Sequence, residues 1–334
     1  MVFEYANRLV NEGCDVYILF LNGETFQKYH LPLFIRRILC NIFTKIEPRW
    51  FNLDRRVKKV SNLDYNYKNK LGKLNAVIAT SAEKTVKEVY SNLNAEKKYY
   101  FIQGYEDWNV SKEFVNNTFK LGLNNIVISK WLKEKVDSIS GKPSVLIPNA
   151  LDTEIYKKKI AMSKRESHTI ALLYHEEKNK GLANAFKVLK VIKEKYPDLK
   201  VKMFGQFPEP NLPKWIKYYR NASQAETVNI YNSSQVFLCS TIEEGFGLTG
   251  FEAMACGSCL VSTNYKGVRE YAIDGYNALL SPVGDIKGQV DNVVRIFEDP
   301  LLREKLSING VNSAKEHSWS EAMKRFNKVL CINQ

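Results

Sequence analysis

The chain has 334 residues, of which 45% are hydrophobic and 25% charged; this is the composition of an ordinary globular protein and excludes a largely disordered one. Its length is sufficient for two domains of common size. Its formal net charge of +13 is compatible with nucleic acid, an anionic membrane surface or phosphorylated small molecules as partners.

The first half of the chain alternates between helical and strand patterns. Apolar residues recur at helical spacing over 2–12 and stop at Gly13. Buried-strand patterns follow at 15–21, 76–80, 98–104, 125–129 and 144–152, and helical patterns at 81–93 and 130–140. Short apolar strands that alternate with helices indicate parallel sheets built from β-α-β units.

The same alternation restarts after a polar stretch at 153–168, which puts a domain boundary near 150–167. Strands are expected at 169–175, 199–205, 235–240, 258–263 and 277–282, and helices at 181–197, 225–234, 249–256, 267–274, 285–314 and 319–331. The pattern predicts two doubly wound α/β domains. A sheet of this kind normally begins with a strand, whereas this chain begins with a helical pattern, so the first strand of the N-terminal domain is expected to be missing.

The segment 28–60 is strongly basic, with nine Lys or Arg residues against two acidic ones, and it also carries many aliphatic and aromatic residues. This mixture favours a peripheral helix on an anionic membrane surface, although a basic-faced helix packed on its own domain has the same composition. No apolar run reaches the roughly 18 residues of a membrane-spanning helix. The N-terminal stretch does not resemble a signal peptide, so a cytoplasmic protein is expected.

Six cysteines are too sparse for a disulfide framework in a chain of this length. Cys256 and Cys259 form a C-x-x-C pair, but a zinc site needs a second pair, which the sequence lacks. The simpler interpretation is that both are small apolar residues where a helix turns into a strand.

The stretch EEGFGLTGFE, residues 243–252, places glycines between two acids, Glu244 and Glu252. It follows an apolar strand and leads into a helix, and ligands of open α/β sheets bind at this end of the strands. The free N–H groups of the helix N-terminus form an anion site suited to phosphate. The helix dipole is expected to keep Glu252 ionised, so that it can hold the hydroxyls of a ribose. An acidic loop followed by a helix-terminal glutamate remains the structural alternative.

The stretch EEGFGLTGFEAMACG, residues 243–257, resembles the E-x7-E signature of retaining GT-B glycosyltransferases, in particular glycosyltransferase family 4. Further matching segments are PNALDTEIY (148–156), KNKGLANAFKVL (178–189), GVREYAIDGYNALLSPVGD (267–285) and SWSEAMKRFNKVL (318–330). The resemblance implies two Rossmann-like domains facing across a cleft. The first is an acceptor-side domain at 1–150, which the last helix at 319–334 rejoins, and the second is a nucleotide-sugar domain at 151–318.

The resemblance also implies roles for individual residues. Lys180 matches the lysine that neutralises the donor diphosphate, and Glu244 is the second catalytic candidate. The family usually has a Gly-Arg pair where this chain has Tyr174 and His175, so the second cation is lost, or is supplied by protonated His175 or by Lys178. The full set of expected donor-binding residues is His175, Lys178, Lys180, Gly245, Phe246, Gly247, Leu248, Thr249 and Glu252.

No D-x-D motif occurs in the chain, so a reaction without a metal or other cofactor is expected. The resemblance implies transfer of a sugar from a nucleotide diphosphate with retention at the anomeric carbon. Glu106 and Asp107 follow a strand of the first domain and are candidates for orienting or deprotonating the acceptor, or are simply loop acids.

The favoured interpretation is a glycosyltransferase of bacterial surface polysaccharide or glycoconjugate assembly, with a lipid-linked or glycan acceptor. The alternative is a non-catalytic GT-B partner or chaperone subunit of another transferase. Nucleic acid is not expected as a partner, because no recognition motif accompanies the positive charge.

Overall fold

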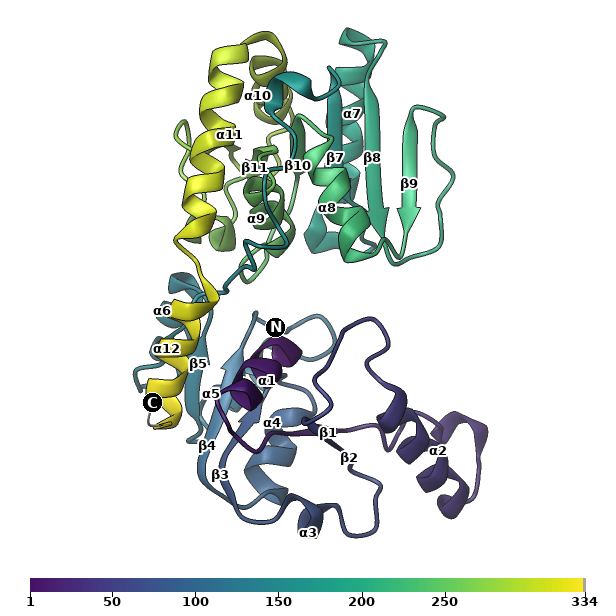
Figure 1. The fold of residues 1–334 in the computed structure, drawn as a ribbon, viewed down its shortest axis with the longest axis vertical. Helices are drawn as coiled ribbons and strands as arrows, with labels where there is room; N and C mark the ends of the chain where they lie inside the picture. The colour runs from purple at the N-terminus through teal and green to yellow at the C-terminus, as the bar shows by residue number, and fades with distance from the viewer. Residues whose placement is uncertain (333–334) are drawn as a thin grey trace. The chain divides into compact units, whose positions relative to one another are not determined.

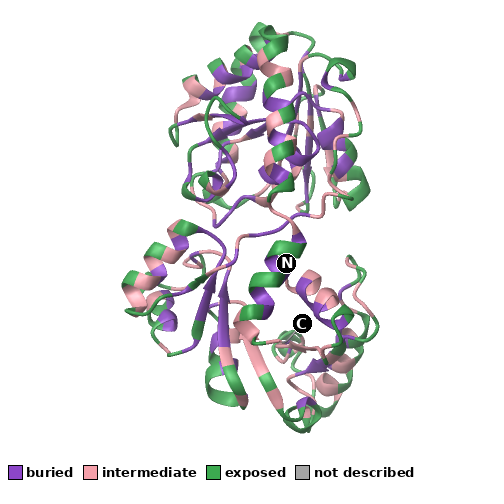
Figure 2. Cartoon of the chain, turned by 60° about the vertical axis from the view of Figure 1, so that its left-hand side comes forward, coloured by how far each residue is buried: buried purple, intermediate pink, exposed green. Residues whose placement is uncertain are grey.

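The computed structural model describes residues 1–332, and these residues divide into two compact units (Figure 1). Unit 1 comprises residues 1–127, 133–146 and the end of the chain from Met323; unit 2 comprises residues 128–132 and 147–322. In both units the buried residues gather on the strands and on the inner faces of the helices (Figure 2).

Unit 1 contains six strands in two parallel sheets. β1 (Tyr17–Phe20) pairs only with β2 (Lys58–Ser61), and the second sheet has the order β3-β4-β5-β6. The strands of the second sheet are β3 (Leu74–Ala79), β4 (Ala95–Ile102), β5 (Asn124–Val127) and β6 (Val145–Leu146). The strands pair in parallel, as expected. Among the described residues, however, no hydrogen-bonded strand pair connects the two sheets of unit 1.

The helices of unit 1 vary widely in length. They are α1 (Val2–Asn11), η1 (Gln27–Tyr29), α2 (Leu33–Ile46), α3 (Tyr67–Leu71), α4 (Thr85–Lys87), η2 (Glu88–Asn92), α5 (Lys112–Phe119), α6 (Lys130–Ser140), whose first residues belong to unit 2, and α12 (Trp319–Leu330), which unit 1 includes from Met323. α12 packs through Phe326 on Tyr5 of α1, with ring centroids 4.4 Å apart. The end of the chain thus completes the core of unit 1.

Unit 2 contains one six-stranded parallel sheet with the order β12-β11-β10-β7-β8-β9. Its strands are β7 (Thr169–Leu173), β8 (Lys200–Gly205), β9 (Ile216–Arg220), β10 (Val236–Cys239), β11 (Cys259–Thr263) and β12 (Ala278–Ser281). The helices are η3 (Met162–Lys164), η4 (Lys178–Lys180), α7 (Leu182–Lys195), α8 (Gln224–Asn232), α9 (Leu248–Ala255), η5 (Lys266–Glu270), α10 (Ile286–Glu298) and α11 (Pro300–Lys315). Aliphatic residues of β7, β8, α7 and α10 share one core. This sheet sets the C-terminal ends of β7 and β10 side by side.

Several expected elements differ from the observed ones. The helix expected over 285–314 is two helices, because Pro300 has no N–H to continue α10 and instead opens α11. The helix expected over 81–93 is only the short α4 followed by the π-helical turn η2. The sequence interpretation also missed α5 and β9. Cys256 and Cys259 are buried free thiols between α9 and β11, which confirms their structural interpretation.

The junction between α10 and α11 allows a direct test of helix capping. The Asp299 carboxylate accepts hydrogen bonds from the N–H groups of Leu301 and Leu302, at 3.0 and 2.9 Å. We expect Asp299→Ala to lower the free energy of unfolding by about 1 kcal/mol, the usual value of an N-cap. Denaturant unfolding measures this loss. Asp291→Ala, an exposed position within α10, is the matched control. Equal effects of the two substitutions would contradict a capping role.

Candidate donor site

The loop between β10 and α9 approaches the loop after β7 closely. Gly181 has φ +65°, and a Cβ atom there would lie 1.9 Å from the backbone oxygen of Ser240. The N–H of Ile242 donates to the backbone oxygen of Asn179 at 2.7 Å. Only glycine permits this approach, which brings together side chains that lie about sixty positions apart in the sequence.

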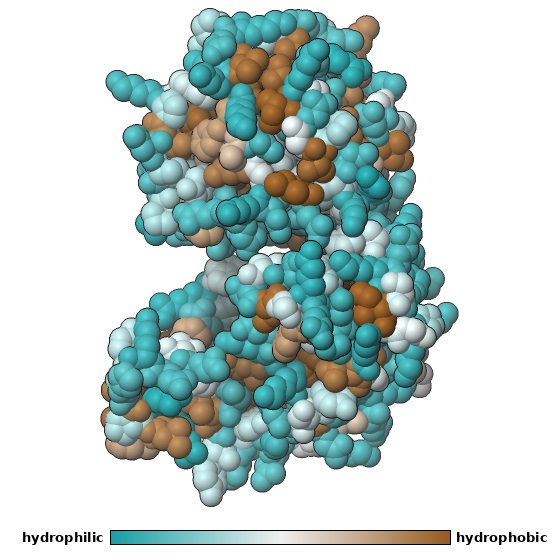
Figure 3. Space-filling model, turned by 180° about the vertical axis from the view of Figure 1, so that it is seen from behind, coloured by the Kyte–Doolittle hydropathy of each residue, from teal (hydrophilic) through white to brown (hydrophobic). Residues whose placement is uncertain are grey.

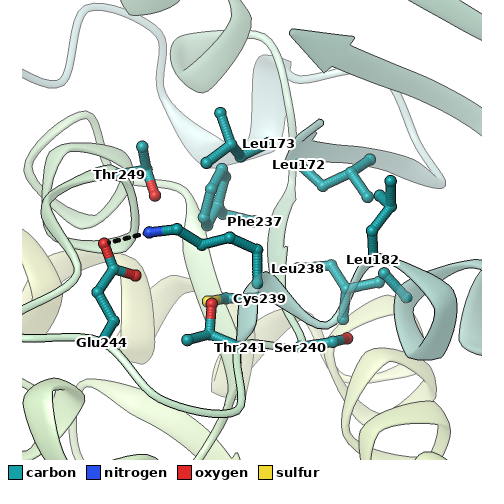
Figure 4. A pocket seen from close by; sticks show the side chains of 12 residues that line it. Leu172, Leu173, Leu182, Phe237, Leu238, Cys239, Ser240, Thr241, Glu244 and Thr249 are labelled. Carbon is teal, nitrogen blue, oxygen red and sulfur yellow. Dashed lines mark hydrogen bonds and ion pairs between the residues drawn. The ribbon is translucent and has the colours of Figure 1, made fainter. Parts of the chain in front are cut away.

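A pocket lies between these two loops (Figure 4). Its lining residues are Leu172, Leu173, Lys180, Leu182, Ala185, Phe237, Leu238, Cys239, Ser240, Thr241, Glu244 and Thr249. The Nζ atom of Lys180 lies 2.8 Å from Oε1 of Glu244, and both side chains are partly open to solvent. A largely apolar lining with one charged pair and the hydroxyl-bearing residues Ser240, Thr241 and Thr249 is suited to an anionic, partly polar ligand.

The N-terminus of α9 supplies further donors beside Thr249. Gly247 is the N-cap residue with φ +98°, and a Cβ atom there would lie 1.8 Å from the hydroxyl of Tyr265, so glycine is required. The first backbone N–H with an acceptor in this turn is that of Phe251, which donates to the Gly247 oxygen at 3.3 Å. Of the hydrogen bonds found in residues 1–332, none is donated by the backbone N–H groups of residues 246–250. These groups and the helix dipole form an anion site.

Glu252 occupies the second turn of α9, and burial dominates its electrostatics. Tyr231 on α8 donates to its carboxylate at 2.9 Å, and Tyr156 is a second hydrogen-bond partner. Desolvation raises the pKa of Glu252 to about 7, against the smaller lowering effect of the two tyrosines. The expectation that the helix dipole keeps Glu252 fully ionised is therefore wrong, because the loss of hydration outweighs the dipole beyond the first turn.

His175 does not supply a second cation. Its Nδ1 atom accepts a hydrogen bond from the N–H of Glu177 at 3.2 Å, and its ring packs edge-on against Phe207. Burial lowers the pKa of His175, so the ring is neutral at neutral pH. Lys178 lies on η4 with an exposed side chain and does not line the pocket. Lys180 is thus the cation that this pocket contains.

Three further residues that were predicted to bind the sugar donor do not line the pocket with their side chains. Phe246 is buried and packs against Phe251 and Tyr271, at ring centroid distances of 5.6 and 5.2 Å, so its side chain belongs to the core. Gly245 is buried, and Leu248 is half-buried at the start of α9. The side chain of Phe246 is therefore not available to a ligand.

Glu106 and Asp107 lie in unit 1, after β4, and do not line the pocket of unit 2. The Glu106 carboxylate accepts a hydrogen bond from the N–H of Ala82 at 2.7 Å, and burial raises its pKa. This contact gives Glu106 a structural role in linking two loops. Asp107 is half-buried.

Sequence reasoning missed the aromatic residues that surround the site. Trp131, Tyr156, Tyr231, Tyr265 and Tyr271 each bond to the E-x7-E segment or to its glutamate. They come from separate places in the chain, and no local motif marks them. Residues 1–332 contain no group of three or more His, Cys, Asp or Glu side chains that could hold a metal ion. No helix among them is long and apolar enough to span a bilayer.

Solved structures define the class of the fold. The structure superposes on sucrose-phosphate synthase from Thermosynechococcus elongatus with a TM-score of 0.74 and 14% identity, over 98% of this chain and 91% of that one. It superposes on Anabaena HepE, solved with UDP and glucose, with a TM-score of 0.72 and 13% identity, over 96% of this chain and 100% of that one. The chain has the GT-B fold of glycosyltransferases.

Sequence similarity is concentrated in unit 2. Residues 156–313 match the family described as glycosyl transferases group 1. Phosphatidyl-myo-inositol mannosyltransferase of Mycolicibacterium smegmatis is 24% identical over 202 residues, which are 57% of this chain and 51% of that protein. CapM of Staphylococcus aureus, a capsular polysaccharide biosynthesis glycosyltransferase, is 24% identical over 167 residues, which are 46% of this chain and 44% of that protein. These matches span about half the length of each relative.

The raised pKa of Glu252 predicts a pH-dependent stability. A folded-state pKa of about 7 against 4.5 for the free group means that ionisation opposes folding, so this contribution to stability is lost as pH rises from about 4.5 to 7. We expect Glu252→Gln to be more stable than the unsubstituted protein at pH 8, by up to about 3 kcal/mol, and similar to it near pH 4.5.

Denaturant unfolding between pH 4.5 and 8 measures this difference. Glu226→Gln is the matched control of opposite sign, because hydrogen bonds from Ser223 lower the pKa of Glu226, whose charge therefore stabilises the fold at neutral pH. A Glu252→Gln difference that does not change with pH would show that Glu252 is ionised throughout.

Proposed function

We propose that the protein is a retaining, metal-independent glycosyltransferase that transfers a sugar from a nucleotide-diphosphate sugar to an acceptor. The observation that carries the proposal is the Lys180–Glu244 pair, 2.8 Å apart, next to the free N-terminus of α9. Its position at the C-terminal ends of β7 and β10 is where ligands of parallel sheets bind.

The chemistry of such a transfer places most of the developing charge on the leaving diphosphate. Lys180 and the first N–H groups of α9 stabilise that charge without a metal ion. In the resting pocket the Glu244 carboxylate holds the Lys180 ammonium in place. When a diphosphate takes over the ammonium, Glu244 is released to accept hydrogen bonds from hydroxyls of the transferred sugar.

Retention requires the acceptor to attack from the face that the diphosphate leaves. The departing diphosphate can then take the acceptor proton itself, so that no separate base is needed. Glu252 accepts hydrogen bonds from the ribose hydroxyls in this arrangement. Because ribose binding favours the carboxylate form, donor binding is coupled to ionisation of a group with a pKa of about 7.

The acceptor is proposed to be lipid-linked or a growing glycan of a bacterial surface polysaccharide or glycoconjugate. The relatives act on phosphatidyl-myo-inositol or serve capsular polysaccharide biosynthesis, according to their names. The proposal includes a cytoplasmic location at the inner face of the membrane.

Helix α2 supports a membrane surface as partner, because its apolar stripe faces outward. Phe34, Ile38, Ile42 and Ile46 follow one another at intervals of four, so they share one helix face, and they are between 46% and 64% exposed. The buried positions of α2 are instead Cys40 and Thr44. Figure 3 shows hydrophobic side chains among hydrophilic ones at lower left, the side where α2 lies after the half-turn from Figure 1.

Polar contacts anchor the inner side of α2. Asn22 donates to the Cys40 oxygen at 3.2 Å and to the Thr44 hydroxyl at 2.9 Å. Exposed basic residues occur before α2, on it and after it, at Lys28, Lys45 and Arg49. An exposed aliphatic stripe with cations beside it is the arrangement of a helix that lies in the interface of an anionic bilayer.

Donor binding is the first test of the proposed function. Calorimetric titration with UDP-, GDP-, dTDP- and ADP-sugars, in the presence of a metal chelator, is expected to show binding of one donor. We expect Lys180→Ala to weaken that binding at least about tenfold, because it removes the charge that faces the diphosphate. Lys187→Ala, an exposed lysine of α7, is the control.

Two outcomes of this titration would count against the proposal. Donor binding that disappears with the chelator would contradict metal independence. Absence of binding by every donor, from a folded sample, would favour the alternative of a non-catalytic GT-B partner subunit. Where a donor binds, the anomeric configuration of the sugar released by slow hydrolysis, followed by NMR, tests retention.

Membrane binding is tested with vesicles. We expect the protein to sediment with vesicles of phosphatidylcholine and phosphatidylglycerol, and Ile38→Glu to reduce the bound fraction about tenfold, because burial of one isoleucine contributes about 1.5–3 kcal/mol. Leu301→Glu, 85% exposed on α11, is the matched control. Equal losses in the two variants, or binding that is independent of phosphatidylglycerol and of salt, would contradict docking through α2.

A further inference from the structure

Three consecutive backbone carbonyls of the E-x7-E loop each accept a hydrogen bond from an aromatic side chain. Trp131 donates its indole Nε1–H to the Gly245 oxygen at 3.0 Å. Tyr271 donates its hydroxyl to the Gly247 oxygen at 2.8 Å, and the Tyr265 hydroxyl lies 3.4 Å from the Phe246 oxygen. All these residues belong to unit 2.

The direction of these carbonyls decides the direction of the neighbouring N–H groups. In a trans peptide the C=O of one residue and the N–H of the next point in opposite directions. Holding the oxygens of residues 245–247 therefore orients the N–H groups of residues 246–248 away from the aromatic donors. These are among the N–H groups for which the described residues provide no acceptor. The aromatic side chains thus bind the carbonyl side of the loop, and the N–H groups on its opposite side remain available to a ligand.

The two tyrosines act as neutral donors inside the protein. Both side chains are buried, and burial raises their pKa values well above the ordinary value, so the hydroxyl protons are retained. The two hydroxyl oxygens lie 3.3 Å apart. Since Tyr265 has one proton between two acceptors, Tyr271 forms the stronger contact with the loop.

Trp131 is itself fixed by the turn η5. The N–H of Lys130 donates to Oε1 of Glu270 at 2.7 Å, which holds the start of α6. The ammonium of Lys266 lies 5.4 Å from the centre of the Trp131 ring, within the range of a cation–π contact. Gly267 lets η5 lie directly on the loop, since a Cβ atom there would be 2.5 Å from the Glu244 oxygen.

We propose that Trp131 and Tyr271, assisted by Tyr265, are positioning residues that preorganise the backbone N–H groups of residues 246–248 for the diphosphate of the donor. This inference rests on the proposed function, because it assigns the loop to diphosphate binding. It separates two roles: the glutamates and Lys180 contact the ligand, whereas the aromatic residues act only through the backbone.

The test uses substitutions that remove one donor and keep the ring: Trp131→Phe and Tyr271→Phe. Affinities are measured calorimetrically for inorganic pyrophosphate, for the nucleotide sugar that binds, and for the nucleoside of that donor. We expect each variant to bind pyrophosphate and nucleotide sugar about fivefold more weakly, with nucleoside affinity unchanged. Trp50→Phe and Tyr67→Phe, both in unit 1, are the matched controls. A melting curve of each variant verifies that it is folded.

The outcomes separate this inference from the proposed function. Pyrophosphate binding that weakens in both variants, with no nucleotide sugar bound by any form, would support the positioning role and overturn the donor assignment. Nucleotide-sugar and pyrophosphate affinities unchanged in folded variants would overturn the positioning role and leave the proposed function intact. Equal loss of nucleoside affinity would show a general structural effect and also overturn it. Absence of pyrophosphate and donor binding in the unsubstituted protein would overturn both.

Discussion

The close backbone contact between the loops after β7 and β10 is the constraint on which the rest of the site depends. It requires that Gly181 lack a side chain, because a Cβ atom would overlap the Ser240 oxygen. Through this contact the Lys180 ammonium reaches the Glu244 carboxylate beside the N-terminus of α9. A cation, a carboxylate and a set of N–H groups without an acceptor among the described residues thereby occupy one end of a parallel sheet, an arrangement chemically suited to an anionic ligand with hydroxyl groups.

Ion pairing and desolvation act differently on the individual ionisable residues of this site. Lys180 and Glu244 form an ion pair whose side chains are both partly open to solvent. Glu252 is enclosed by Tyr156 and Tyr231, and there desolvation outweighs both hydrogen bonds and raises the pKa to about 7. Desolvation lowers the pKa of His175 instead of raising it, because the charged form of histidine is the protonated one.

In unit 1, helix α2 has its apolar face toward the outside. Burying Cys40 and Thr44 while exposing Phe34, Ile38, Ile42 and Ile46 reverses the usual pattern of a surface helix. Asn22 compensates for the polar inner face with hydrogen bonds. The exposed apolar stripe is the feature of α2 that the proposed binding to a membrane surface would bury.

The sequence by itself determined the alternation of strands and helices, the parallel pairing and the loop with its two glutamates, because apolar periodicity and glycine spacing are local properties. It did not reveal α5, β9 or the break at Pro300 inside an otherwise continuous helical pattern. Only the tertiary structure decided the raised pKa of Glu252, the lowered pKa of His175, the outward stripe of α2, and the aromatic donors Trp131 and Tyr271. The physical reason is that desolvation and side-chain contacts depend on neighbours from distant parts of the chain, which no local pattern specifies.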